Sequence, residues 1–97
     1  MLNLKPFQVE IIKNILKKNI PELTVWAFGS RVNNTAKPHS DLDLVVLGNT
    51  PIEEKIMFGL KDDFEESDLP IRVDVLDWNT ISDSFKQIIE KNYLVLQ

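Results

Sequence analysis

The sequence predicts a small α/β (α+β) domain built from a three-stranded sheet flanked by helices. Apolar residues recur at helical spacing in separate segments, and short runs rich in Val, Leu and Ile lie between these segments. Strands that alternate with helices pack as one sheet covered by helical layers. The chain of 97 residues is long enough for one core. We therefore expect residues 1–97 to form a single domain, too small to include a second domain that binds a substrate.

The first helix and the first strand are predicted from periodicity. A helix is expected between Pro6 and Asn19, and Pro21 marks its end. Residues 23–28 are apolar on both faces, which is typical of a central strand covered on both sides. Residues 31–40 are expected to form a short helix or a loop. The apolar face of the first helix consists of Phe7, Ile11, Ile12, Ile15 and Leu16.

Two further strands are predicted at residues 42–47 and 71–76, where β-branched residues and leucine dominate. Residues 67–70 separate the last strand from the helix before it. The C-terminal tail, residues 93–96, holds more apolar surface than one helix face can bury. It either contacts a partner protein or returns to the domain's own core as a short strand or helix end.

Two candidate capping boxes predict where the later helices begin. Thr50 and Glu53 are three residues apart, and Pro51 would take the first helical position. Thr80 and Asp83 form the second candidate. The expected apolar stripes of the two helices are Ile52, Ile56, Leu60 and Phe64, and Ile81, Phe85, Ile88, Ile89 and Asn92 or Tyr93.

The charge is unevenly distributed. The formal net charge is −4, which argues against extended nucleic-acid binding, since that mode depends on Lys and Arg. Residues 29–40 contain Arg31 and Lys37 but no acid, whereas residues 53–68 contain seven acids and two lysines. A small polyphosphate is therefore expected at residues 29–40.

The residue inventory limits the metal and the location. With no cysteine, a metal would need oxygen ligands or the single histidine, His39, and hard cations such as Mg²⁺ suit oxygen ligands. No apolar run approaches the roughly 18 residues that span a bilayer, and the N-terminal residues lack a secretory stretch. We expect a cytoplasmic protein with no membrane contact.

The sequence Gly29-Ser30-Arg31, followed by Asp41-Leu42-Asp43, carries the functional prediction. If residues 42–46 form a strand, its alternation directs Asp41 and Asp43 to one face. Two aspartates at a central position repel one another unless a cation compensates, so this pair indicates a metal site for phosphate chemistry. Gly29 and Ser30 could be an ordinary turn, or an anion nest whose amides bind a phosphate.

These motifs resemble the minimal nucleotidyltransferases of the DNA polymerase beta superfamily. Gly29-Ser30 and Asp41-Leu42-Asp43 match the family signature, and Asp74 on a later strand matches its third acid. The chain departs from the pattern at Asn34, where many members have glycine. The resemblance covers the whole chain and implies a polymerase-beta-like core with a mixed sheet.

The resemblance further implies a reaction that uses two Mg²⁺ ions and an NTP donor. The enzyme would transfer NMP, AMP from ATP in the expected case, to an acceptor hydroxyl. Asp41, Asp43 and Asp74 would be the metal ligands and catalytic residues, with Asp74 beside the acceptor. The expected nucleotide-binding residues are Gly29, Ser30, Arg31 and Ser40.

Several assignments have alternatives. Asp74 could simply pair with Arg72, and Asp77 competes with it, although the odd spacing directs Asp77 to the opposite face. Arg31 could be a phosphate ligand or a solvated or partner-facing residue. His39 is expected in an exposed loop.

For partners, the resemblance implies a small all-helical protein of the HEPN or substrate-binding type. In such pairs the transferase can be the antitoxin that adenylylates a tyrosine of its toxin. One alternative is a non-catalytic antitoxin module that binds a nucleotide or only the partner. The other is an enzyme that nucleotidylates a small molecule.

Overall fold

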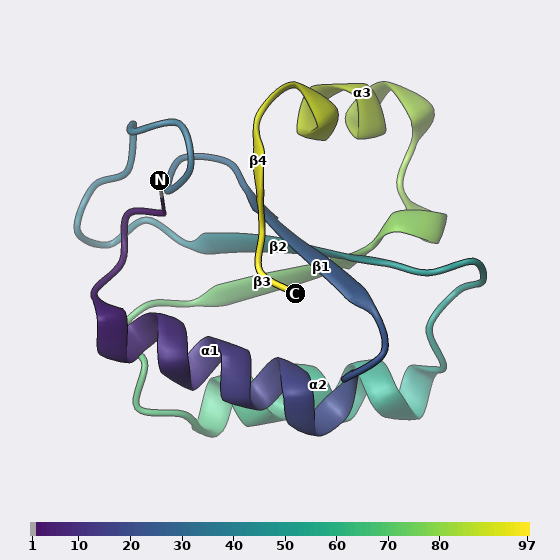
Figure 1. Ribbon diagram of the computed structural model, residues 1–97, viewed down its shortest axis with the longest axis horizontal. Helices are drawn as coiled ribbons and strands as arrows, with labels where there is room; N and C mark the ends of the chain where they lie inside the picture. Colours follow the sequence, from purple (N-terminus) through teal and green to yellow (C-terminus); the bar gives the residue numbers. More distant parts are fainter. Residues whose placement is uncertain (1) are drawn as a thin grey trace.

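The computed structural model describes residues 2–97, and Figure 1 shows a sheet with α1 and α2 on one side and α3 on the other. The sheet pairs segments that are distant in the sequence, such as residues 26–28 and residues 93–95. The elements in chain order are α1 (Pro6–Asn19), β1 (Thr24–Phe28), β2 (Leu42–Leu47), α2 (Glu54–Glu66), β3 (Val73–Asp77), the short 3₁₀ helix η1 (Trp78–Thr80), α3 (Asp83–Lys91) and β4 (Tyr93–Val95).

The sheet is mixed, as the family resemblance implies, but it has four strands and not the expected three. The strand order is β3-β2-β1-β4. β1 runs antiparallel to both β2 and β4, whereas β2 and β3 are parallel. The fourth strand has only three residues, too few for a recognisable alternation of apolar and polar side chains.

The C-terminal tail returns to the domain's own core, which was one of the two alternatives. Leu96 is only 9% exposed, and its amide donates a hydrogen bond of 2.8 Å to the carbonyl of Val25. The side chain of Gln97 donates to the carbonyls of Ile20 and Leu23 at 2.7 and 2.9 Å. Val95 points outward and stays 62% exposed.

The two faces of the sheet have different cores. The α1 and α2 face buries the larger one, which includes Ile12, Leu16, Leu44 and Leu60. Helical periodicity places the α1 residues among these on a single face, as predicted. The smaller core lies under α3 and centres on Phe28, Val45 and Ile89. Since α3 has only nine residues, it covers part of its face, and a cavity lies beside it.

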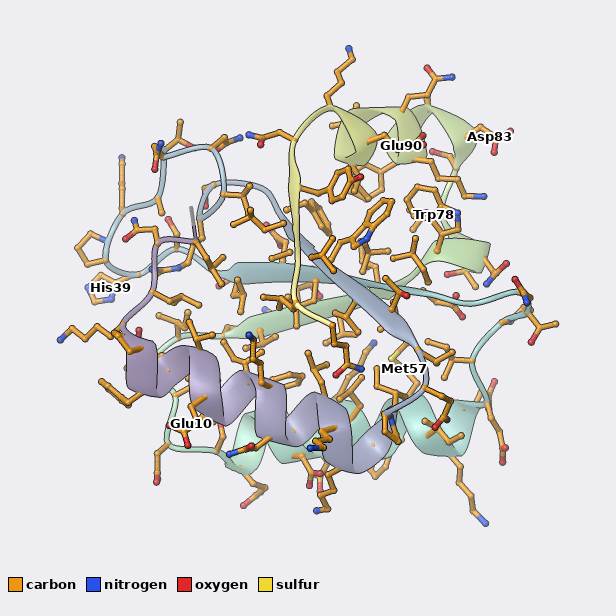
Figure 2. The ribbon with its side chains drawn as sticks, viewed as in Figure 1. Glu10, His39, Met57, Trp78, Asp83 and Glu90 are labelled. Atoms are coloured by element: carbon orange, nitrogen blue, oxygen red, sulfur yellow. The ribbon has the colours of Figure 1, made fainter. Side chains whose placement is uncertain are left out.

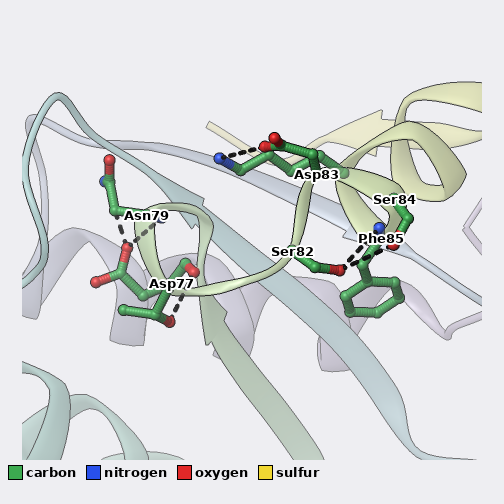
Figure 3. Close-up of polar contacts among 8 residues, drawn as sticks. Asp77, Asn79, Ser82, Asp83, Ser84 and Phe85 are labelled. Carbon is green, nitrogen blue, oxygen red and sulfur yellow. Dashed lines mark hydrogen bonds and ion pairs between the residues drawn. The ribbon is translucent and has the colours of Figure 1, made fainter.

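Both predicted capping boxes are wrong. α2 begins at Glu54 without a side-chain cap, and Thr50 lies outside it, where its carbonyl accepts a hydrogen bond from Asn79. Thr80 belongs to η1, and the N-cap of α3 is Ser82, whose hydroxyl accepts from the Phe85 amide at 3.2 Å (Figure 3). Serine caps as well as threonine does, so sequence spacing alone cannot choose between neighbouring candidates.

The role of the tail can be tested by truncating one side chain. Leu96→Ala should lower the free energy of unfolding by about 2–3 kcal/mol, because it leaves a cavity in the larger core. Val95→Ala is the matched control at the neighbouring, exposed residue and should change the free energy of unfolding by less than about 0.5 kcal/mol. Urea denaturation measures both, and equal losses would contradict the placement of the tail.

Candidate active site

Two carboxylates lie side by side on the α3 face of the sheet. Asp43 on β2 is paired in register with Asp74 on β3, and Phe28 on β1 extends the same row. Neighbouring strands are about 4.8 Å apart, so the two side chains leave the sheet close together in the same direction. Both are half-buried. The parallel register therefore brings together the two acids that the sequence could only place on separate strands.

The electrostatics of Asp43 are unfavourable in the absence of a cation. Burial raises the pKa of Asp43 above 3.8, and the nearby charges of Asp74 and Asp41 raise it further. Among residues 2–97 the ion pairs are Lys18 with Asp63 and Lys86 with Asp83, and neither reaches this site. The pairing of Arg72 with Asp74, considered from sequence, is not among them. The protein thus holds repelling carboxylates without a basic side chain to neutralise them.

Asp41 stands apart from the other two acids. It precedes β2 and is exposed, although its charge still acts on Asp43. In the described part of the chain, no three acidic or histidine side chains are grouped closely enough to form a metal site. His39 lies at the outer edge of its loop, away from the sheet (Figure 2). The structure therefore brings Asp43 and Asp74 together and leaves Asp41 at the margin.

The turn at Gly29 abuts the carboxylate of Asp43. Gly29 has a φ of 81°, a left-handed conformation, and a Cβ built on it would collide with Oδ2 of Asp43. After the turn, the amides of Val32 and Asn33 donate to the Gly29 carbonyl. Asn34 has a φ of 63°, so asparagine supports the left-handed backbone at the position where many family members have glycine.

Arg31 holds the loop together instead of facing open solvent. Its guanidinium is buried and donates to the carbonyls of Asn3, Lys37, Pro38 and Ser40. These bonds occupy both terminal nitrogens and Nε. The Ser40 hydroxyl accepts from the Lys37 amide at 2.9 Å. The contacts of Arg31 and Ser40 thus fix the shape of residues 29–40, which differs from the direct phosphate contact expected of them.

Asp77 has a structural role on the opposite face of the sheet, as its spacing from Asp74 predicts. It is 8% exposed, and its carboxylate accepts from the amides of Ile52 and Asn79 at 2.8 and 2.9 Å. Figure 3 shows the contact with Asn79, whose own side chain reaches the carbonyls of Gly48 and Thr50. Asp77 therefore ties β3 to the segment that precedes α2.

A cavity of about 330 Å³ lies beside the carboxylates and reaches from the Gly29 turn to α3. Periodicity assigned Phe85 and Ile88 to the apolar stripe of a helix, yet both line this cavity. Asn33 also lines the cavity, and no pattern in the sequence predicted a role for it. Helical periodicity revealed the apolar stripe, but its position beside Asp43 and Asp74 depends on the strand order, which periodicity does not show.

Comparison with known proteins identifies the family. The model of the family described as "Polymerase beta, Nucleotidyltransferase" matches residues 10–97. The chain belongs to this family. It is 49% identical over 96 residues to the probable protein adenylyltransferase MntA of Haemophilus influenzae, and the match covers 99% of this chain and 84% of that protein. The chain is thus a nucleotidyltransferase and a homologue of MntA.

Solved structures agree with this family. A crystal structure of a toxin–antitoxin with AMP-PNP superposes with a TM-score of 0.76 at 27% identity, over 92% of this chain and 72% of that chain. A structure of a tri-AMPylated Shewanella oneidensis HEPN toxin in complex with MNT antitoxin matches with a TM-score of 0.64 at 23% identity, over 92% and 71% of the two chains. At this level of identity, the match to the Shewanella oneidensis complex shows a shared fold alone. Within residues 2–97, no helix has the length and apolar character that crossing a membrane requires.

The repulsion at Asp43 predicts how stability depends on pH. Because its pKa is raised in the folded state, ionised Asp43 destabilises the metal-free protein at neutral pH. Asp43→Asn should therefore raise the urea midpoint at pH 7, and the gain should shrink as the pH falls through the raised pKa towards 3.8. A gain that is the same at pH 7 and pH 4 would contradict the electrostatic cause.

The structural role of Asp77 predicts a different outcome. Asp77→Ala should reduce the free energy of unfolding by about 1–3 kcal/mol, because buried amides lose their acceptor. Asp62→Ala on the exposed face of α2 is the control and should change it by less than about 0.5 kcal/mol. Chemical denaturation compares the two, and equal effects would show that Asp77 does not stabilise the fold.

Proposed function

We propose that this protein is the antitoxin of a two-component pair and transfers AMP from ATP to a hydroxyl group of a small helical partner of the HEPN type. The observation that carries the proposal is the row formed by Asp43 and Asp74 beside the Gly29 turn. Phosphoryl chemistry asks a protein mainly to position groups and neutralise charge, and this row offers carboxylates to hold the cations that would neutralise the phosphates. The proposed location is the cytoplasm, because the donor is a nucleotide.

The donor set fits Mg²⁺. Asp43 and Asp74 supply hard oxygen ligands at adjacent positions, and Asp41 lies near enough to act on Asp43. Rotation of the exposed Asp41 side chain would complete the set of three acids. Two bound Mg²⁺ ions would neutralise the phosphates and lower the pKa of the acceptor hydroxyl. Burial and the charges of Asp74 and Asp41 raise the pKa of Asp43, and a bound cation would offset the repulsion between these charges.

Each remaining residue has a defined place in the proposal. Asp74 lies on the edge strand β3, open to an approaching acceptor, and holds the carboxylate that orients the hydroxyl. Gly29 and Ser30 bring backbone amides to the donor phosphates without a Cβ in the way. Arg31 and Ser40 act indirectly, by fixing the loop that presents those amides.

The partner and the donor are supported by the relatives. The Haemophilus influenzae MntA is named a probable protein adenylyltransferase, and the crystal structure with AMP-PNP is a toxin–antitoxin. The fold is also that of an MNT antitoxin solved with a HEPN toxin. Asp74 lies on the edge strand β3, where a partner would complete the site around the acceptor.

The proposal is tested by mass spectrometry of the co-purified partner after incubation with ATP and Mg²⁺. The wild-type protein should add AMP to a hydroxyl of the partner. Asp74→Asn should slow transfer at least about 100-fold while ATP still binds, because its role lies with the acceptor. Asp62→Asn is the matched control and should transfer at the normal rate.

Two outcomes would overturn the proposal. A partner that binds tightly but gains no mass would favour a non-catalytic antitoxin, for which the marginal position of Asp41 is the supporting observation. Equal transfer by wild type and Asp74→Asn would remove Asp74 from the site.

A further inference from the structure

The cavity beside the carboxylates has two chemically different ends. Asp43 and Asp74 line it, Gly29 and Asn33 line the end at the loop, and α3 lines the other end. A single open space therefore connects the turn proposed to hold phosphates with an apolar helix face. Its volume of about 330 Å³ is within the range of small-molecule sites.

The α3 end is held firmly and presents apolar surface to the cavity. Phe85 packs edge-to-face against Phe28 with ring centroids 5.8 Å apart, so its ring is fixed in position. Ile88 lies one turn further along the helix, on the same side as Phe85. Its neighbour Ile89 is buried in the core, whereas Ile88 remains 62% exposed.

Ile88 is not buried in the core, and its exposed side chain lines the cavity. We propose that Phe85 and Ile88 form the binding surface for the nucleoside of the donor nucleotide. This inference rests on the proposed function, which places the phosphates at Gly29 and Ser30. With the phosphates there and the carboxylates alongside, the nucleoside occupies the remaining part of the cavity, against α3. A planar base gains free energy by covering apolar side chains.

Asn92 supplies the polar contact that such a surface needs. It caps the C-terminal end of α3, is exposed and lines the same cavity. A carboxamide both donates and accepts hydrogen bonds, so it complements the edge of a base that carries both kinds of group. Apolar walls with one convergent polar group are typical of small-molecule sites.

The test compares two probes that share phosphates but not a nucleoside: Mg²⁺-ATP and inorganic triphosphate with Mg²⁺. Ile88→Asp should weaken binding of ATP about tenfold more than binding of triphosphate, because the lost apolar contact affects only ATP whereas the added charge affects both. Ile88→Leu should restore ATP binding. Phe58→Asp is the matched control, since Phe58 is 73% exposed on α2 and does not line the cavity. Titration calorimetry measures the dissociation constants of both probes for each variant, and circular dichroism checks that each variant is folded.

Other outcomes would overturn the inference. Unchanged ATP binding in Ile88→Asp would remove the nucleoside from this surface, and equal weakening of both probes would show a general disturbance of the site. Unchanged ATP binding together with slower transfer to the partner would assign the surface to the acceptor. If the partner gains no AMP but Ile88→Asp still weakens ATP binding more than triphosphate binding, the proposed catalysis is wrong and the inferred nucleoside surface is retained.

Discussion

The register between the parallel strands β2 and β3 is the constraint on which the site depends. It sets Asp43 beside Asp74, and the antiparallel register of β1 sets Phe28 and then the Gly29 turn next to them. A slip of one residue in either strand would turn one carboxylate to the opposite face. The alternating apolar residues of β2 prevent this, because Leu42, Leu44 and Val46 are fully buried on the other side.

Several polar contacts outside this row maintain its geometry. Arg31 joins the loop after β1 to the N-terminal segment and to the residue that precedes Asp41. Asp77 joins the end of β3 to the segment before α2. Both side chains are buried, and both form hydrogen bonds with main-chain groups. The cost of holding like charges together at Asp43 is offset by this frame and by the core under the sheet.

Local patterns in the sequence predicted most of the elements, and the family resemblance predicted the fold. The alternation along β3 correctly placed Asp74 and Asp77 on opposite faces, whereas the position of Asp43 beside Asp74 came only from the parallel register. The short strand β4 was only one alternative for the tail, because three residues give no periodicity. The caps of α2 and α3 were missed, because neighbouring Ser, Thr and Glu compete for the same role. The burial of Arg31 and the cavity at Ile88 were not predictable, since both depend on contacts between segments distant in sequence.

The central claim is that Asp43 and Asp74 form the cation site of a nucleotidyltransferase. It is tested most directly by titrating Mg²⁺ into the wild-type protein and into Asp43→Asn and Asp74→Asn, each with AMP-PNP, while thermal unfolding is followed. The account predicts that Mg²⁺ raises the melting temperature of the wild type, that Asp43→Asn removes most of this increase, and that Asp74→Asn reduces it by a smaller amount. An equal increase in all three proteins would contradict it.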